Sequence, residues 1–137
     1  MYQFNIKKLY FYFKFQNHIG QKMLTSNYNI EELVIEKLKT IKDLELPVNI
    51  YELGLIYKIS IENINDKTQV TIEMTTIHSQ SGSTKPITHL VRSAVETIDE
   101  VDECHIRFVF TPKWDLSMMS KEGLQKLRDA ESRNYQM

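Results

Sequence analysis

The sequence predicts a small α+β fold, a single two-layer domain with helices on one face of a small mixed sheet. Two stretches with apolar residues every three or four positions predict helices, and three stretches of alternating apolar and polar residues predict strands. The expected order is helix, strand, strand, helix, strand, with a C-terminal tail helix. Both amphipathic helices can bury their apolar stripes on the same face of such a sheet, and 137 residues suffice for one core.

The first helix is expected to begin at Asn29, a capping residue, with Glu32 three positions later as in a capping box. Leu46-Pro47 is expected to end it, because the residue before a proline is disfavoured in the helical region. Its apolar face is formed by Ile30, Val34, Leu38 and Ile41.

Two alternating stretches with a turn between them predict a hairpin. The turn is the polar stretch "NINDK". The apolar positions are Leu55, Tyr57, Ile59 and Ile61 in the first strand, and Val70, Ile72 and Met74 in the second.

The second helix is expected from Pro86, which suits a first helical turn. Ser120 is expected to cap the tail helix, after "TPKW" has ended the third strand. The apolar stripe of the second helix contains Ile87, Leu90, Val91, Ala94, Val95 and Ile98. One face of the third strand contains Cys104, Ile106, Phe108 and Phe110.

Composition excludes several function classes. The chain has 17 Lys+Arg and 18 Asp+Glu, so we expect no nucleic-acid partner. No apolar run approaches the ~20 residues that span a bilayer, so we expect no membrane partner. The single cysteine excludes an internal disulfide and a Cys/His zinc box, and it fits a reducing, cytoplasmic compartment.

Residues 1–22 are expected to be an N-terminal appendage, and residues 23–137 the domain. Residues 1–30 contain four Lys and no acidic residue, and the first 22 are rich in aromatic side chains without a steady period. This appendage is either an organelle-targeting extension or an upstream reading from a start before Met23.

The polar loop before the second helix is the first candidate site. Residues 79–85 lead into a helix N-terminus, which favours an anion or a thiolate, and a polar connector capped by Thr84 is the alternative. His78 and Ser81 have the chemistry of a base and a nucleophile, but no G-x-S-x-G elbow accompanies them.

Three further groups carry candidate chemistry. Cys104 lies among apolar residues of its strand, so we expect a buried structural thiol. His89 falls on the polar side of its helix and is expected to be solvated. Asp43 and Glu45 form a solvated turn, unless the fold brings them toward the 78–84 loop.

The stretch "DLELPVNIYELGLIYKISI" resembles the opening signature of the SufT and PaaD family, small proteins of iron–sulfur cluster assembly and cluster-enzyme maturation. Members typically read D-P-E-[IL]-P-V-N-I-x-[ED]-L-G-L-[IV]-Y, and only the proline differs here, replaced by Leu44. "VTIEMT", "AVETIDEVDECHIRFVF" and "TPKWDLSMMSKEG" resemble later family segments, so the likeness covers about residues 30–127.

The same resemblance implies a loop that has lost its reactive atom. In the family the loop after the second strand normally reads like T-T-P-G-C-P, and counting from the Met-Thr that ends in Thr75 places Ser81 at the cysteine. An alcohol is protonated near neutral pH and is a poor ligand for a cluster. The likeness also assigns Asp43 and Glu45 to family acids near the loop, while His78 falls where a family threonine stands.

The resemblance implies a non-catalytic accessory factor in iron–sulfur cluster assembly or in maturation of cluster-containing proteins, working through protein–protein interaction. Its expected partners are assembly or client proteins, and a homodimer is a further alternative. A cluster would be held only transiently or through non-family ligands. The competing hypothesis is a small enzyme or ligand-binding domain that reuses residues 78–84. The residues expected to contact partners are Tyr51, Glu52, Trp114, Met118 and Met119.

Overall fold

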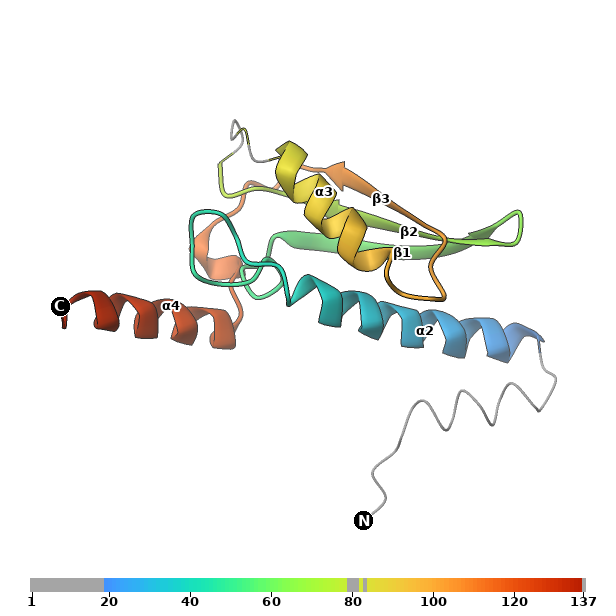
Figure 1. Cartoon of the computed structure of the whole chain (residues 1–137), viewed down its shortest axis with the longest axis horizontal. Helices are drawn as coiled ribbons and strands as arrows, with labels where there is room; N and C mark the ends of the chain where they lie inside the picture. Colours follow the sequence, from blue (N-terminus) through green and yellow to red (C-terminus); the bar gives the residue numbers. More distant parts are fainter. Residues whose placement is uncertain (1–18, 79–81, 83, 137) are drawn as a thin grey trace, which may run out of the picture.

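The computed structural model describes residues 19–78, 82 and 84–136, and in this part of the chain the predicted order of elements is confirmed (Figure 1). The elements are helix α2 (Ile19–Leu38), strands β1 (Ile56–Ile64) and β2 (Lys67–Met74), helix α3 (Thr84–Val95), strand β3 (Glu103–Phe108), the 3-10 helix η1 (Leu116–Met118) and helix α4 (Lys121–Asn134). The fold class is confirmed as α+β.

The sheet is mixed, with the strand order β1-β2-β3. β1 and β2 pair antiparallel through the predicted turn, where Asn65 and Asp66 adopt positive φ angles of 52° and 63°. Such angles are what a tight two-residue hairpin turn requires, and Asn and Asp tolerate them better than most residues do. β3 pairs parallel with β2, because α3 carries the chain back to the same end of the sheet.

The core lies between the sheet and the two helices α2 and α3, which cover one face (Figure 1). The alternating pattern of β2 is confirmed, since Val70, Ile72 and Met74 are fully buried. Two predicted inward residues are exposed. Leu90 is 43% exposed on the flank of α3, and Phe110 is 40% exposed because β3 ends at Phe108.

The predicted limits of the first helix are wrong at both ends. α2 begins at Ile19, so Asn29 lies inside the helix, where its side chain is buried instead of capping. No proline interrupts residues 19–38, and the helical period extends beyond the capping signal. α2 ends at Leu38, eight positions before Leu46, because the following residues form a loop of their own.

The division of the chain at residue 22 stays a prediction. The helix α2 crosses that position, so a domain that began at Met23 would start within the helix. Among the described residues, no helix is both long enough and apolar enough to cross a membrane.

Candidate functional site

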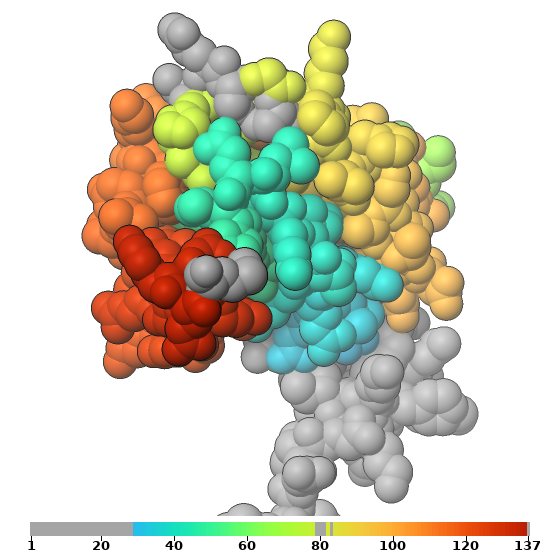
Figure 2. Space-filling model, turned by 60° about the vertical axis from the view of Figure 1, so that its left-hand side comes forward, coloured from blue at the N-terminus to red at the C-terminus, as the bar shows by residue number. Residues whose placement is uncertain are grey.

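The fold brings two of the predicted site segments together at one end of the sheet. Glu45 lies on the loop after α2, and His78 lies just beyond β2. The His78 Nε2 and Glu45 Oε2 atoms are 3.3 Å apart. Figure 2 looks onto this end, where the blue-green loop after α2 lies beside the yellow-green residues that follow β2. The fold therefore brings Glu45 toward the 78–84 loop, which is the condition for this acidic turn to be part of a candidate site.

Asp43 lies on the same loop as Glu45, but its carboxylate is hydrogen-bonded to backbone groups of that loop. Its Oδ2 accepts hydrogen bonds from the backbone N–H groups of Glu45 at 2.9 Å and Leu46 at 3.0 Å. The Asp43 N–H in turn donates to Val48 O at 3.0 Å. Asp43 thus closes the turn that replaces the expected helix end, and it positions Glu45.

The threonines that follow β2 hold the chain rather than present free hydroxyls. Thr75 is 1% exposed, and its N–H donates to Leu55 O at 2.9 Å. The Thr76 hydroxyl donates to His78 O at 2.6 Å, which fixes the start of the loop. Ser81, the position that the resemblance assigns to the family cysteine, lies outside the described residues.

The Glu45–His78 pair alone makes neither a metal centre nor a catalytic triad. Both side chains are more than half exposed, so their attraction is weakened by water. Within the described part of the chain, no group of three or more His, Cys, Asp or Glu side chains could hold a metal ion. The chemistry available here is a polar, titratable surface beside the loop.

A second feature of this end is a tight turn formed by "NIYELG". The Asn49 side-chain oxygen accepts the Glu52 N–H at 2.8 Å, and the Leu53 N–H donates to Asn49 O at 3.0 Å. Gly54 then has a φ of +78°, which strains any residue with a side chain. A Cβ atom on Gly54 would also lie 2.2 Å from Met118 O, so this turn packs directly against the segment around η1.

Glu52 connects that turn to the segment before α4. Its carboxylate accepts a hydrogen bond from the Ser120 hydroxyl and lies 3.5 Å from Lys39 Nζ. Its backbone oxygen accepts the Ser120 N–H at 2.9 Å. Glu52 is one of the residues expected to contact partners, but these contacts bury it and leave it only 7% accessible.

Residues on both sides of Ser120 also pack against the turn that contains Glu52. The Trp114 indole N–H donates to Leu53 O at 2.7 Å, which leaves the ring half-buried. A Cβ atom on Gly123 would lie 2.7 Å from Glu52 O, so α4 approaches the turn at van der Waals distance. The predicted cap is confirmed, since the Ser120 hydroxyl accepts the Gly123 N–H at 2.9 Å. The two signature segments of the sequence are thus one packed unit.

The remaining predicted contact residues divide into buried and accessible ones. Met119 is buried in the core, and Met118 is half-buried beneath the Gly54 turn. Tyr51 is half-buried, with Lys39 Nζ 5.2 Å from the centre of its ring. Lys39, which lies outside the signature and was not expected to contact it, therefore also belongs to this unit.

Tyr57 joins this unit to the sheet. Its hydroxyl donates to Pro112 O at 2.6 Å and lies 3.6 Å from the Met118 sulfur. Burial raises the pKa of the Tyr57 phenol, a hydrogen bond with Thr75 lowers it, and the nearby Asp115 carboxylate raises it. Tyr57 is therefore a neutral structural donor at physiological pH.

Cys104 is a buried structural thiol, as predicted. It lies in β3 on the helix-facing side of the sheet and is 2% exposed. Its pKa is raised to about 12, first by burial and then by the Glu96 carboxylate, while the Arg92 guanidinium lowers it. A thiol in this state is neither a ready metal ligand nor a nucleophile.

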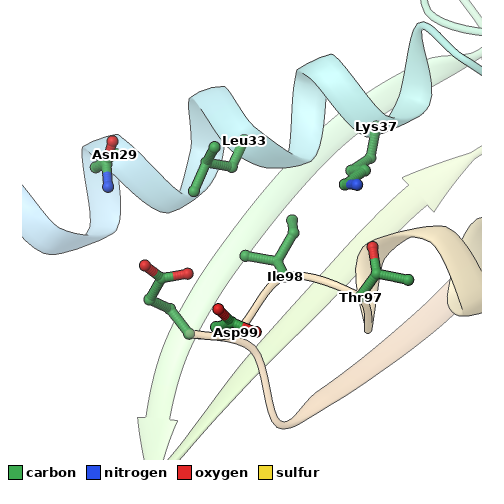
Figure 3. A pocket seen from close by; sticks show the side chains of 7 residues that line it. Asn29, Leu33, Lys37, Thr97, Ile98 and Asp99 are labelled. Atoms are coloured by element: carbon green, nitrogen blue, oxygen red, sulfur yellow. The ribbon is translucent and has the colours of Figure 1, made fainter. Parts of the chain in front are cut away.

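A separate pocket of about 420 Å³ lies between α2 and the connection from α3 to β3 (Figure 3). None of its lining residues is a predicted site residue. They are Asn29, Leu33, Lys37, Thr97, Ile98, Asp99 and Glu100.

Comparison with known proteins agrees with the family suggested by the signature. Residues 31–107 match the model of the family described as iron–sulfur cluster assembly protein. The chain belongs to this family. An Fe-S protein maturation auxiliary factor of Porphyromonas gingivalis is 35% identical over 97 residues, which are 71% of this chain and 90% of that protein. The Staphylococcus aureus Fe-S protein maturation auxiliary factor SufT is 30% identical over 79 residues, 58% of this chain and 86% of that protein.

Solved structures of relatives have the same fold. A domain of unknown function from Bacillus anthracis has a TM-score of 0.66 and 27% identity, covering 73% of this chain and 92% of that one. A conserved hypothetical protein from Thermotoga maritima has a TM-score of 0.58 and 29% identity, covering 69% and 90%. The matched residues 31–107 include Glu52 but end before Trp114 and Ser120, the other half of the packed unit.

We predict that the Cys104 thiol reacts slowly with a thiol reagent in the folded protein and rapidly after denaturation. In the folded protein the pKa of this thiol is about 12, whereas its ordinary value is 9.0. For the same reason this thiol lowers the stability of the fold as the pH rises through that interval, because the folded state then binds more protons than the unfolded state. Labelling rates with and without denaturant, followed by mass spectrometry, measure the first effect.

A comparison of wild type with Cys104→Val, both unfolded by denaturant at pH values across that interval, measures the second. Fast labelling of the native protein would contradict the assignment of Cys104 as a core thiol.

Proposed function

We propose that this family member is a non-catalytic accessory factor, which assists iron–sulfur cluster assembly or the maturation of cluster-containing proteins by contacting other proteins. Its partners would be assembly proteins or client proteins, and the cluster would be their cargo. The Porphyromonas gingivalis and Staphylococcus aureus relatives, both named as maturation auxiliary factors, support the role. We also propose a cytoplasmic site of action.

The observation that carries this proposal is the state of the only cysteine. Iron–sulfur clusters are held mainly by thiolates, and Cys104 is buried, protonated and on the inner face of the sheet. The resemblance places Ser81 where the family has its loop cysteine. The residues of one chain therefore do not fit a resident cluster with cysteine ligation, whereas the scaffold around Glu52 is complete.

We propose that partners contact the accessible parts of the packed unit. Tyr51 and Trp114 each present part of an aromatic ring, and Leu116 on η1 is 59% exposed. Glu52 and Met119, which are buried, would support this surface from below, and Met118 would do so in part. Aromatic and apolar side chains held on a rigid base are the usual anchors of protein interfaces.

The competing function is a small enzyme or ligand-binding domain that uses residues 78–84. One observation favours it, namely the accessible Glu45–His78 pair beside the loop. A carboxylate that accepts from an imidazole can orient it as a general base. The experiments below separate the two functions, because only the competing one requires His78.

We predict that the purified protein does not retain an iron–sulfur cluster after anaerobic reconstitution. Ser81→Cys should raise the bound iron, because a thiol near a helix N-terminus is more readily ionised. Absorption spectra together with iron and sulfide analysis measure this, with Ser117→Cys on η1 as a control thiol in an exposed position. A cluster in the wild type that disappears in Ser81→Ala or His78→Ala would contradict the prediction.

We predict that the wild-type protein, purified from its native cell by an affinity tag, brings down cluster-assembly proteins or cluster-containing enzymes. Leu116→Ser should reduce their recovery, because it removes an exposed apolar contact from the proposed surface. Tyr135→Ser is the matched control, since Tyr135 is also exposed but lies at the end of α4. Quantitative mass spectrometry compares the three samples.

Recovery of no cluster protein by the wild type, with turnover or ligand binding that depends on His78, would overturn the accessory role. Full recovery by a folded Leu116→Ser variant would overturn the proposed surface while leaving the role intact.

A further inference from the structure

The outer side of β3 is one of the two edges of the described sheet, and β1 forms the other. In a parallel pair, alternate residues direct their N–H and C=O groups toward the neighbouring strand. The Val109 N–H donates to Met74 O at 2.8 Å, so the odd-numbered residues of this segment face β2. Cys104, Ile106 and Phe108 therefore direct their backbone groups away from the sheet.

Arg92 of α3 and Glu96, which directly follows the last residue of α3, cover only the first part of that edge. The Cys104 N–H donates to Glu96 Oε1 at 3.2 Å, and Arg92 Nε donates to Cys104 O at 3.2 Å. These two side chains protect the edge as a neighbouring strand would. In the described part of the chain, no side chain does the same for Ile106 or Phe108.

A surface pocket of about 350 Å³ lies beside this uncovered part of the edge. It is lined by Thr84, Lys85, Thr88, His89, Arg92 and Phe108. No carboxylate is among these residues, and Lys85 and His89 are exposed residues of α3. The Phe108 ring, which forms the apolar part of the lining, stacks on Phe110 with the ring centres 6.4 Å apart.

We propose that this uncovered edge and its basic pocket bind an extended acidic segment of a partner protein by strand addition. The outward backbone groups of Ile106 and Phe108 would pair with the backbone of the added strand. A side chain of that strand pointing to the helix side would enter the pocket, where an aspartate or glutamate meets Lys85, His89 and Arg92. The apolar side chains next to this acidic residue in the added strand would pack on Phe108.

Charge selects this occupant over the two other candidates. A second copy of the chain would bring the basic flank of α3 close to its own equivalent. Residues 1–30 carry four Lys and no acidic residue, so the N-terminal part of this chain has the same sign as the pocket. An acidic segment of another protein is complementary to both features. The inference does not depend on the iron–sulfur role, so either can fail alone.

The test is a titration of the full-length, isotope-labelled protein with a short capped peptide of alternating glutamate and valine, followed by amide NMR shifts. The matched probe replaces each glutamate by lysine. We expect saturable shifts at Ile106, Phe108 and Lys85 with the acidic peptide alone, weaker in high salt because the pocket is exposed. Lys85→Glu should raise the Kd about fivefold. Lys126→Glu, the same charge change on exposed α4, should leave it unchanged.

Three results would overturn the proposal. They are the absence of saturable shifts at Ile106 and Phe108, equal binding of the lysine peptide, and concentration-dependent shifts of the same amides without peptide, which would assign the edge to a second copy of the chain. A change at these amides that Lys85→Glu leaves unaltered would place the acidic side chain elsewhere and would overturn the pocket assignment.

Discussion

The buried carboxylate of Glu52 is the contact on which the arrangement of this end of the molecule depends. It lies between Lys39, at the end of α2, and Ser120, the cap of α4, while its own backbone belongs to the turn before β1. A carboxylate this deeply buried is stable only when its oxygens are satisfied. One side chain therefore ties together a helix end, a strand entrance and a helix start that are far apart in the sequence.

Because of this contact, several residues of the family signature are required by the packing of the chain and not by the chemistry of the loop. Gly54 and Gly123 allow backbone approaches that a Cβ atom would prevent, and the Trp114 indole donates a hydrogen bond to Leu53, just before Gly54. These requirements hold whether or not the neighbouring loop carries a thiol. A chain can therefore keep all of the signature but its proline even where, as the resemblance implies, Ser81 replaces the loop cysteine. A role in protein contacts is compatible with all that is kept.

The sequence predicted what depends on local periodicity. The alternation at Val70, Ile72 and Met74 and the capping signal at Ser120 were sufficient for the strand and the tail helix. It did not predict the burial of Glu52, because the partner that satisfies it is 68 positions away. The helix start predicted at Asn29 is wrong for a related reason, since a residue type that caps helices can also be buried within one. In the candidate site, the pairing of Glu45 with His78 depends on the tertiary contact between the loop after α2 and the end of β2, which local sequence patterns do not predict.

The most direct test of this account is a double-mutant cycle between Glu52→Gln and Ser120→Ala, measured as free energies of unfolding in denaturant. We expect a coupling free energy of about 1–2 kcal/mol, because each side chain satisfies the other in a buried setting. Ser120→Ala combined with Glu122→Gln, an exposed carboxylate on α4, is the control and should be additive. Additivity of Glu52→Gln and Ser120→Ala within about 0.3 kcal/mol would contradict the central role of this contact.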